Sequence, residues 1–276
     1  MHSSATKHST PLLGVDFSSA PTRHKPITLA EGIRQGQVLR LEGLKVFDSL
    51  DGLATFLAQP ADWLGGFDFP FGLPRELVLA LDWPQNWPDL IAHYSRLSRA
   101  EIRSLFAGFC AARPVGAKFA HRACDGPAGS SPSMKWVNPP VAWMLHAGVP
   151  LLLQAGVHLP GLHAGDSRRI ALEAYPGLLA REILGRRSYK SDDKAKQTPE
   201  RLIARKDLID ALEQGRTRLA LRLKLSHAQR DALIDDGRGD RLDAVLCLIQ
   251  AAWASSRPNY GLPAEIDPLE GWIVSA

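Results

Sequence analysis

The sequence has few cysteines and no long apolar run, and these two shortages exclude several classes of protein. Its three cysteines, Cys110, Cys124 and Cys247, lie far apart and form no CxxC pair. We therefore expect neither a disulfide framework nor a dedicated zinc site, and we infer a reducing cytoplasm as the compartment. No window approaches the roughly 20 apolar residues of a membrane span, so no membrane partner is expected.

Several catalytic signatures are also missing. The chain contains no GxSxG elbow, no HExxH pattern among its nine histidines and no Gly-rich phosphate loop of the Walker type. These absences argue against an α/β-hydrolase, a zinc protease and a P-loop enzyme. The opening residues lack the apolar segment of a secretory signal, and we expect a short disordered tail at 1–11.

The composition is that of an ordinary soluble domain with one uneven feature, its charge. Of 276 residues, 45% are hydrophobic and 22% charged, which allows a sizeable core in a single domain over 12–276. The net charge is +4, yet residues 181–206 alone carry nine Lys/Arg against four Asp/Glu. This basic stretch favours a polyanionic partner, although a solvated helical face with ordinary charge pairs explains it equally well.

The apolar pattern predicts a mixed α/β fold, with a five-stranded sheet flanked by helices. Strands are expected at 12–17, 26–33, 37–47, 63–69 and 168–176. Helices are expected at 48–59 with Asp48 as N-cap, and at 74–82, 89–107, 177–184, 199–214, 226–236 and 239–256. Residues 84–165, which include a long Gly/Pro/Ser loop at 124–140, form a helical and loop insertion after the fourth strand.

Acidic residues stand at the edges of these apolar elements. They are Asp16, Asp68, Glu173, and the pair Asp240 and Asp243. An acid at the carboxyl end of an inner strand lies where α/β folds form their clefts. Clustered buried carboxylates repel one another, and a divalent cation relieves this repulsion. Mg²⁺ or Mn²⁺ prefers such oxygen ligands, and two ions about 4 Å apart can activate water against a phosphodiester.

Each acid also has a plain structural explanation. Asp16 can form a turn with the two serines that follow it, and Asp68 can cap a turn before Pro70. Glu173 can pair with an arginine of the basic stretch, and Asp240 can cap a helix without losing its capacity to bind metal. Asp243 shares a helix face with apolar residues three and four positions on, which predicts that it points inward.

Four motifs together resemble a known family. They are "GVDFSS" (14–19), "GGFDFPFGLP" (65–74), "LEAYP" (172–176) and "GDRLDAVLCLIQAAW" (239–253). In their order and spacing they resemble the domain of unknown function 429 (DUF429), a family regarded as predicted nucleases with a ribonuclease H-like fold. The resemblance covers about 12–82 and 168–256 and leaves the insertion unmatched.

The resemblance implies a three-stranded antiparallel start continued by parallel strands. It also implies that catalytic acids are Asp16 on the first strand, Asp68 after the fourth, and Asp243 with Asp240 on a late helix. Of these, Asp16, Asp68 and Asp243 are the implied metal ligands, while Glu173 belongs to the family's E-x-x-P-like motif. Many ribonuclease H-like nucleases carry Glu where this chain has the shorter Asp68, which puts the metal geometry in question.

Further residues are expected to contact the substrate. We expect Ser18 and Ser19 to support the metal or contact phosphate. Candidates for the nucleic-acid backbone are the basic residues Lys118, Arg122, Lys135, Arg187 and Lys190. If exposed, Trp136 and Tyr189 could stack bases.

The leading hypothesis is therefore a Mg²⁺- or Mn²⁺-dependent nuclease acting on DNA or RNA. One alternative is a phosphate- or nucleotide-binding protein of the actin and sugar-kinase branch of the same fold, whose first strand also ends in Asp followed by small hydroxyl residues. Such proteins usually need two facing domains, and 276 residues is short for that. Another alternative is a non-catalytic nucleic-acid-binding module in which the acids are structural.

Overall fold

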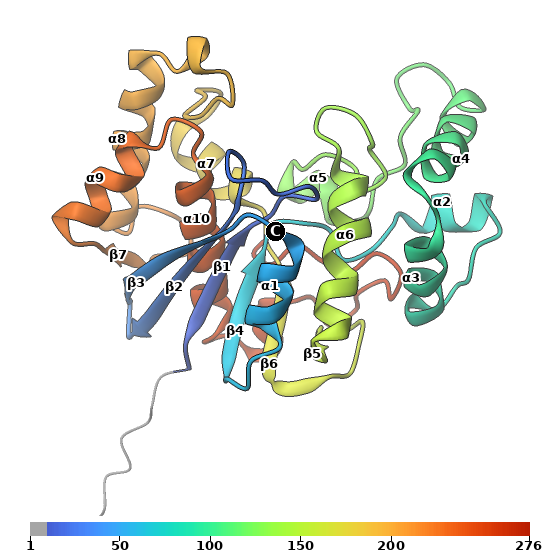
Figure 1. Ribbon diagram of the computed structural model, residues 1–276, viewed down its shortest axis with the longest axis horizontal. Helices are drawn as coiled ribbons and strands as arrows, with labels where there is room; N and C mark the ends of the chain where they lie inside the picture. Colours follow the sequence, from blue (N-terminus) through green and yellow to red (C-terminus); the bar gives the residue numbers. More distant parts are fainter. Residues whose placement is uncertain (1–9) are drawn as a thin grey trace, which may run out of the picture.

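The computed structural model describes residues 10–276, and its centre is a mixed sheet (Figure 1). The sheet order is β5-β6-β4-β1-β2-β3-β7. The strands are β1 (Leu12–Asp16), β2 (Ile27–Gln35), β3 (Val38–Phe47), β4 (Trp63–Phe67), β5 (Val157–His158), β6 (Asp166–Glu173) and β7 (Arg222–Lys224). The tail expected at 1–11 falls mostly outside the described residues.

The five expected strands are present, but the strand count was wrong. Two short strands, β5 and β7, add one edge each, so the described sheet has seven strands. They contain two and three residues, which is too short to produce a readable alternation of apolar and polar side chains. The pairs β1–β2 and β2–β3 are antiparallel, and the remaining four pairs are parallel.

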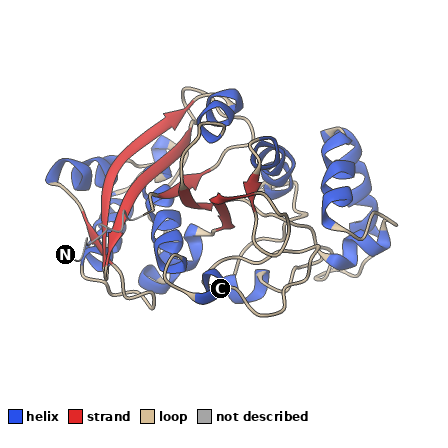
Figure 2. Cartoon of the chain, turned by 90° about the horizontal axis from the view of Figure 1, so that it is seen from below, coloured by secondary structure: helices blue, strands red, loops and turns tan. Residues whose placement is uncertain are grey.

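Helices cover both faces of this sheet (Figure 2). They are α1 (Leu50–Leu57), α2 (Arg75–Ala80), α3 (Trp87–Arg96), α4 (Arg99–Ala111), α5 (Asp125–Ala128), α6 (Val141–Gln154), α7 (Pro176–Leu184), α8 (Pro199–Glu213), α9 (His227–Asp235) and α10 (Asp240–Ala254), with 3-10 turns η1 (Lys194–Lys196) and η2 (Pro258–Gly261). No helix among these residues is both long and apolar enough to cross a bilayer.

Successive side chains of β1 point to opposite faces of the sheet, and they pack into two separate hydrophobic cores. Leu13 and Val15 point to a core shared with α1, α3 and α6, whereas Leu12 points to a second core shared with α7, α8 and α10. Gly14 lies on the α10 side, where a Cβ atom would lie 2.1 Å from the Ala244 carbonyl oxygen. The absence of a side chain at position 14 therefore lets α10 lie directly against the strand.

Local signals explain where two expected helices differ from the structure. The helix expected over 89–107 is two helices, because Ser98 and Glu101 form a capping box that starts α4 after α3 has ended. The N-cap of α1 is Ser49 rather than Asp48, since the Ser49 hydroxyl accepts the backbone N–H of Gly52. Helix α6 in the insertion was not expected at all.

The insertion at 84–165 builds one face of the domain. Its buried side chains Tyr94, Phe106 and Met134 belong to the same core as Val15 of β1. Tyr94 also donates a hydrogen bond to the Ala142 carbonyl oxygen at 3.0 Å, which ties α3 to α6. The insertion is thus continuous with the sheet's core, and it leads the chain back to β5 and β6.

Candidate functional site

Two predicted acids meet at the carboxyl ends of the central parallel strands. Asp16 is the last residue of β1, and Asp68 follows directly on β4, its parallel neighbour. The Asp68 N–H donates to the Val15 carbonyl oxygen at 2.9 Å, which extends the ladder by one residue. Parallel pairing thus places both carboxyl groups at one edge of the sheet.

Helix α10 adds the other two acids from behind the sheet. It begins at Asp240, after Gly239 adopts a positive φ of 79°. Asp240 is the first helical residue rather than the N-cap, and Asp243 lies one turn further on with no exposed surface. Because α10 lies directly on β1, its first turn reaches the strand ends. We call Asp16, Asp68, Asp240 and Asp243 the carboxylate cluster.

The four acids are close enough to perturb one another. Burial, followed by the charge of Asp243, raises the pKa of Asp68 to about 7. Burial and then Asp243 also raise the pKa of Asp16 well above its ordinary value, and burial with Asp236 raises that of Asp240 to about 6. Asp16, Asp68 and Asp240 line one cavity of about 410 Å³, together with Ser18 and Ser19. Like charges in a partly desolvated space account for these shifts.

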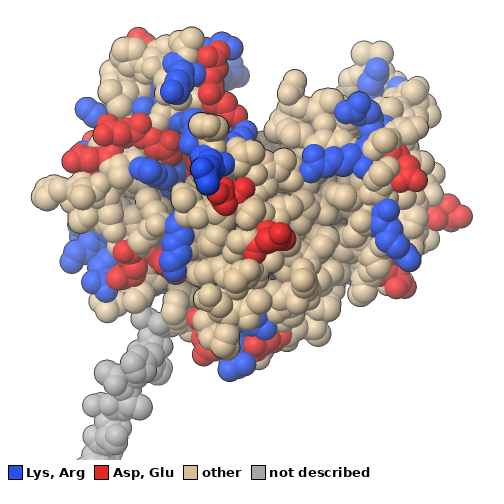
Figure 3. Space-filling view, viewed as in Figure 1, with Lys and Arg blue, Asp and Glu red and all other residues tan. Residues whose placement is uncertain are grey.

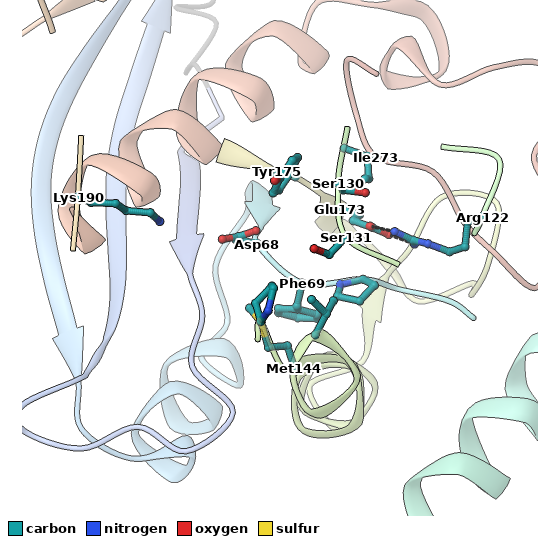
Figure 4. Close-up of a pocket in the computed structure, with 14 residues that line it drawn as sticks. Asp68, Phe69, Arg122, Ser130, Ser131, Met144, Glu173, Tyr175, Lys190 and Ile273 are labelled. Carbon is teal, nitrogen blue, oxygen red and sulfur yellow. Dashed lines mark hydrogen bonds and ion pairs between the residues drawn. The ribbon is translucent and has the colours of Figure 1, made fainter. Parts of the chain in front are cut away.

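Two neighbouring side chains bind the carboxyl group of Asp243. It accepts hydrogen bonds from the Tyr189 hydroxyl and from the Lys190 ammonium group. Burial lowers the pKa of Lys190, but Asp243, Tyr189 and Asp16 raise it by more, so Lys190 stays protonated. Figure 4 shows the Lys190 side chain extending toward Asp68. Lys190 thus places one positive charge inside a group of four acids.

The cluster matches a hard divalent cation in donor chemistry. All of its donors are carboxylate oxygens, and Oδ2 of Asp240 is buried without a hydrogen-bond partner. Within residues 10–276, however, no three His, Cys, Asp or Glu side chains stand as a ready metal-ligand group. The Lys190 side chain is 42% exposed, and its ammonium group binds the fully buried Asp243.

Glu173 lines a cavity together with Asp68, and its charge contributes to the raised pKa of Asp68, but its own oxygens are bonded elsewhere. It forms a buried ion pair with Arg122, whose Nη2 lies 2.6 Å from Oε1. Its Oε2 accepts the Phe71 N–H at 2.9 Å. A glutamate whose two oxygens are used in this way holds the chain after β4 in place. The pairing with an arginine was one of the alternatives, but that arginine comes from the insertion rather than from the basic stretch.

The basic residues that were expected to contact a nucleic-acid backbone do not lie together. Arg122 is 3% exposed and bound to Asp125 and Glu173, so its assignment to a nucleic-acid backbone was wrong. Arg187 pairs with Asp207, 2.6 Å away, in a hollow that the cluster acids do not line. Lys118 and Lys135 line none of the described cavities around the cluster. Only Lys190 lies at the site.

Some charges of the basic stretch at 181–206 are paired with acids, among them Arg187 with Asp207 at 2.6 Å and Lys196 with Asp193 at 3.4 Å. Figure 3 shows Lys and Arg side chains alternating with Asp and Glu over the lobe of α8 and α9. Arg230 of α9 pairs with Asp210 and Glu213 of α8. These charge pairs fit the alternative of a solvated helical face, and a polyanionic partner for the stretch stays a prediction.

Three site residues were not expected in the places they take. Tyr189, proposed as an exposed aromatic, is 7% exposed and bonded to Asp243. Lys25 and Arg238 line the same cavity as Asp16. Arg238 immediately precedes "GDRLD", the start of the motif on α10. Its position next to two candidate acids could have identified it as a site residue. Trp136, the other aromatic candidate, is only partly buried, against Phe106 and Phe119.

No protein-family model matches the chain, and the searches of curated proteins and of solved structures found no match either.

Proposed function

We propose that this protein is a metal-dependent nuclease that hydrolyses phosphodiester bonds of nucleic acid at the carboxylate cluster. The observation that carries the proposal is the meeting of four acids from β1, the end of β4 and the start of α10, far apart in sequence. Burying three perturbed carboxyl groups together costs stability, and such clusters are typical of sites that act on a cation or proton.

The arrangement of the sheet supports the ribonuclease H-like part of this proposal. Strands β3, β2 and β1 are antiparallel, and β4 and β6 continue the sheet in parallel. This is the order that the resemblance to the domain of unknown function 429 implies, with β5 and β7 as added edges. Membership of that family is part of the proposal, and a fold alone does not establish an activity.

Asp16, Asp68 and Asp243 would hold Mg²⁺ or Mn²⁺, with Asp240 beside them. Oδ2 of Asp240 accepts no hydrogen bond and lies 3.5 Å from Nε of Arg238. A bound divalent cation would neutralise these acids and support both the attacking and the leaving oxygen of a phosphodiester. The shorter reach of Asp68, compared with Glu, is offset by its place directly at the strand end.

The chain's own residues supply the remaining steps. Without metal, a pKa of about 7 keeps part of Asp68 protonated near neutral pH, and a bound cation would displace that proton. Lys25, Lys190 and Arg238 give the cavity positive charges that attract a phosphate. The hydroxyl groups of Ser18 and Ser19 line the same cavity and can donate to phosphate oxygens. The three cysteines are free and buried, which supports the inferred cytoplasmic location.

Cleavage of labelled DNA and RNA tests the proposal. Single-stranded, duplex and branched substrates are incubated with Mg²⁺ or Mn²⁺ and with wild type, Asp16→Asn or Asp51→Asn. Asp51 is an exposed acid of α1 that lines none of the described cavities, so it is the matched control. We expect metal-dependent cleavage by wild type and by the control, and a loss of at least about 100-fold in Asp16→Asn.

Absence of cleavage on every substrate would contradict the proposal. Calorimetric titration with Mg²⁺ and with inorganic phosphate then separates the two alternatives. Phosphate binding that Ser18→Ala weakens would favour a phosphate-binding protein. Nucleic-acid binding without metal dependence would favour a non-catalytic module.

A further inference from the structure

A second cavity lies directly beside the carboxylate cluster and has a different chemistry. Its volume is about 330 Å³, and it shares Asp68, Pro139, Met144 and Lys190 with the cavity that holds the acids. Through these shared residues the two cavities adjoin. Figure 4 shows Asp68 and Lys190 on the shared wall of the second cavity. A group bound in the second cavity is therefore adjacent to the proposed reacting centre.

Apolar and aromatic side chains dominate the walls of this second cavity. Phe69, Met144, Tyr175 and Ile273 are among the lining residues. Phe69 is held rigidly, since its ring packs against Phe17 at a centroid distance of 4.7 Å and against neighbouring aromatics. The guanidinium group of Arg181 lies over the Tyr175 ring, 5.2 Å from its centre, and restricts its movement. Flat, ordered walls of this kind suit a planar ring.

Four charged residues line the second cavity: Asp68 and Lys190 on the wall shared with the acids, and Arg122 and Glu173 away from it. Arg122 and Glu173 bind each other, so neither offers free charge to a ligand. Ser130 donates to Asp125 at 3.0 Å, whereas the hydroxyl of Ser131 is directed toward the cavity (Figure 4). The cavity therefore suits a neutral ring with a few polar edges and disfavours a phosphate.

A more basic hollow also adjoins the cavity of the acids, although two of its basic side chains are in ion pairs, Lys25 with Asp192 at 2.8 Å and Arg23 with Asp48 at 3.8 Å. This third hollow, of about 580 Å³, is lined by four Lys/Arg (Arg23, Lys25, Lys194 and Arg238) against two Asp. It shares Lys25, Asp192 and Arg238 with the cavity of the acids. Basic hollow, carboxylate cluster and apolar cavity thus follow one another in a continuous row. A nucleotide chain has the same succession of phosphates, reacting phosphodiester and base.

We propose that the apolar cavity receives one unpaired nucleobase, and that the protein therefore acts on single-stranded nucleic acid rather than on an intact duplex. This inference rests on the proposed nuclease function and names its substrate class. The cavity volume lies near the lower end of the range for small-molecule sites, about 300 to 1,000 Å³, and so suits one nucleotide unit. A base within a duplex cannot enter it without leaving the stack.

Binding of a labelled oligonucleotide tests the inference without any need for cleavage. Full-length Asp16→Asn protein is titrated, with Mg²⁺ present, against a 12-nucleotide single strand and the blunt duplex of the same sequence, read by fluorescence anisotropy. Val141→Trp is added to fill the cavity, since Val141 lines it and does not line the cavity of the acids. Val137→Trp is the matched control, because Val137 is 48% exposed and lines neither cavity.

We expect the single strand to bind at least ten-fold more tightly than the duplex. Val141→Trp should abolish that preference, Val137→Trp should keep it, and thermal unfolding should show both variants folded. Equal binding of strand and duplex, or an unchanged preference in folded Val141→Trp, would overturn the inference even if wild type cleaves nucleic acid. A Val141-dependent preference in a protein that cleaves nothing would support the base site and refute the nuclease.

Discussion

Asp243 has no exposed surface, and two neighbouring residues rather than water balance its charge. The Tyr189 hydroxyl and the Lys190 ammonium group both donate to it. The two donors are consecutive in sequence and come from the chain between α7 and α8. Removing one of them leaves a buried carboxylate with too few partners, which is costlier than losing a surface ion pair.

We expect Lys190→Met to destabilise the metal-free protein by about 1 to 3 kcal/mol. The reason is that Asp243 loses its positive partner while its burial is unchanged. Mg²⁺ should raise the Tm of this variant by more than it raises that of wild type, because the competing ammonium group is gone. Thermal unfolding with EDTA and with Mg²⁺ measures both effects.

The matched control for Lys190 is Lys196→Met. Lys196 pairs with Asp193 at 3.4 Å, and both side chains are more than half exposed. Its loss should leave both Tm values unchanged. Equal responses of the two variants would show that the cluster does not depend on Lys190.

The raised pKa of Asp68 makes stability depend on pH. Its pKa is about 7 in the folded chain against 3.8 for the free group. The folded state therefore binds the proton more tightly than the unfolded state does. The stabilisation is complete below pH 3.8 and is lost as pH rises toward about 7.

Without metal, we expect the Tm of wild type to fall between about pH 4 and pH 7, by an amount equivalent to roughly 1 to 3 kcal/mol. Asp68→Asn should flatten this dependence and be the more stable protein at pH 8, whereas Asp51→Asn should follow wild type. Differential scanning fluorimetry in EDTA across this pH range gives the slopes. A slope unaffected by Asp68→Asn would mean that this carboxyl group is already ionised at low pH.

At the scale of elements, the contact between β1 and α10 positions the site. A Cβ atom at Gly14 would lie 2.1 Å from the Ala244 carbonyl oxygen and 2.2 Å from the Leu248 nitrogen. These are backbone atoms, which cannot move aside as the end of a side chain can. Helix α10, and with it Asp240 and Asp243, depends on this close approach.

Gly14→Ala should therefore destabilise the fold by about 3 kcal/mol or more, or prevent folding. Gly43→Ala is the control within the same sheet, since the nearest atom to its Cβ would be Glu31 Oε2 at 3.8 Å. Urea unfolding followed by circular dichroism compares the two variants. Similar midpoints for both would show that α10 shifts freely along β1.

The elements themselves were largely readable from the sequence. The strands ending at Asp16 and Glu173, and the helix beginning at Asp240, lie where the apolar pattern predicted them. Helix α6 was missed because it follows two prolines and contains a third, Pro150, which made its sequence read as part of a loop. Strands β5 and β7 were missed because two or three residues are too few to show the alternation of apolar and polar side chains that identifies a strand.

At the scale of the whole molecule, one buried ion network joins three distant parts of the chain. Arg122 of the insertion binds Asp125 and, across the cavity, Glu173 of β6. Its Nη1 also donates to the Glu270 carbonyl oxygen at 3.1 Å, in the C-terminal segment. The insertion and the C-terminal segment are thus fixed to the sheet beside the site.

Arg122→Met should cost about 3 to 5 kcal/mol, because two buried carboxylates lose their positive partner. The double variant Arg122→Met with Glu173→Gln should recover part of that loss, since one of the stranded charges is removed. Chemical denaturation of wild type, both single variants and the double variant gives the coupling energy. Additive effects would contradict a shared network.

The sequence by itself determined the elements and the candidate acids. Apolar periodicity places strands and helices, and an acid at the end of a buried strand stands out because burying it costs free energy. The tertiary structure decided which acids meet. Parallel pairing of β1 with β4, and the close fit of α10 on Gly14, bring the four acids of the carboxylate cluster together. Glu173 instead forms an ion pair with Arg122. Partners more than fifty residues apart are selected by packing, which no local pattern encodes.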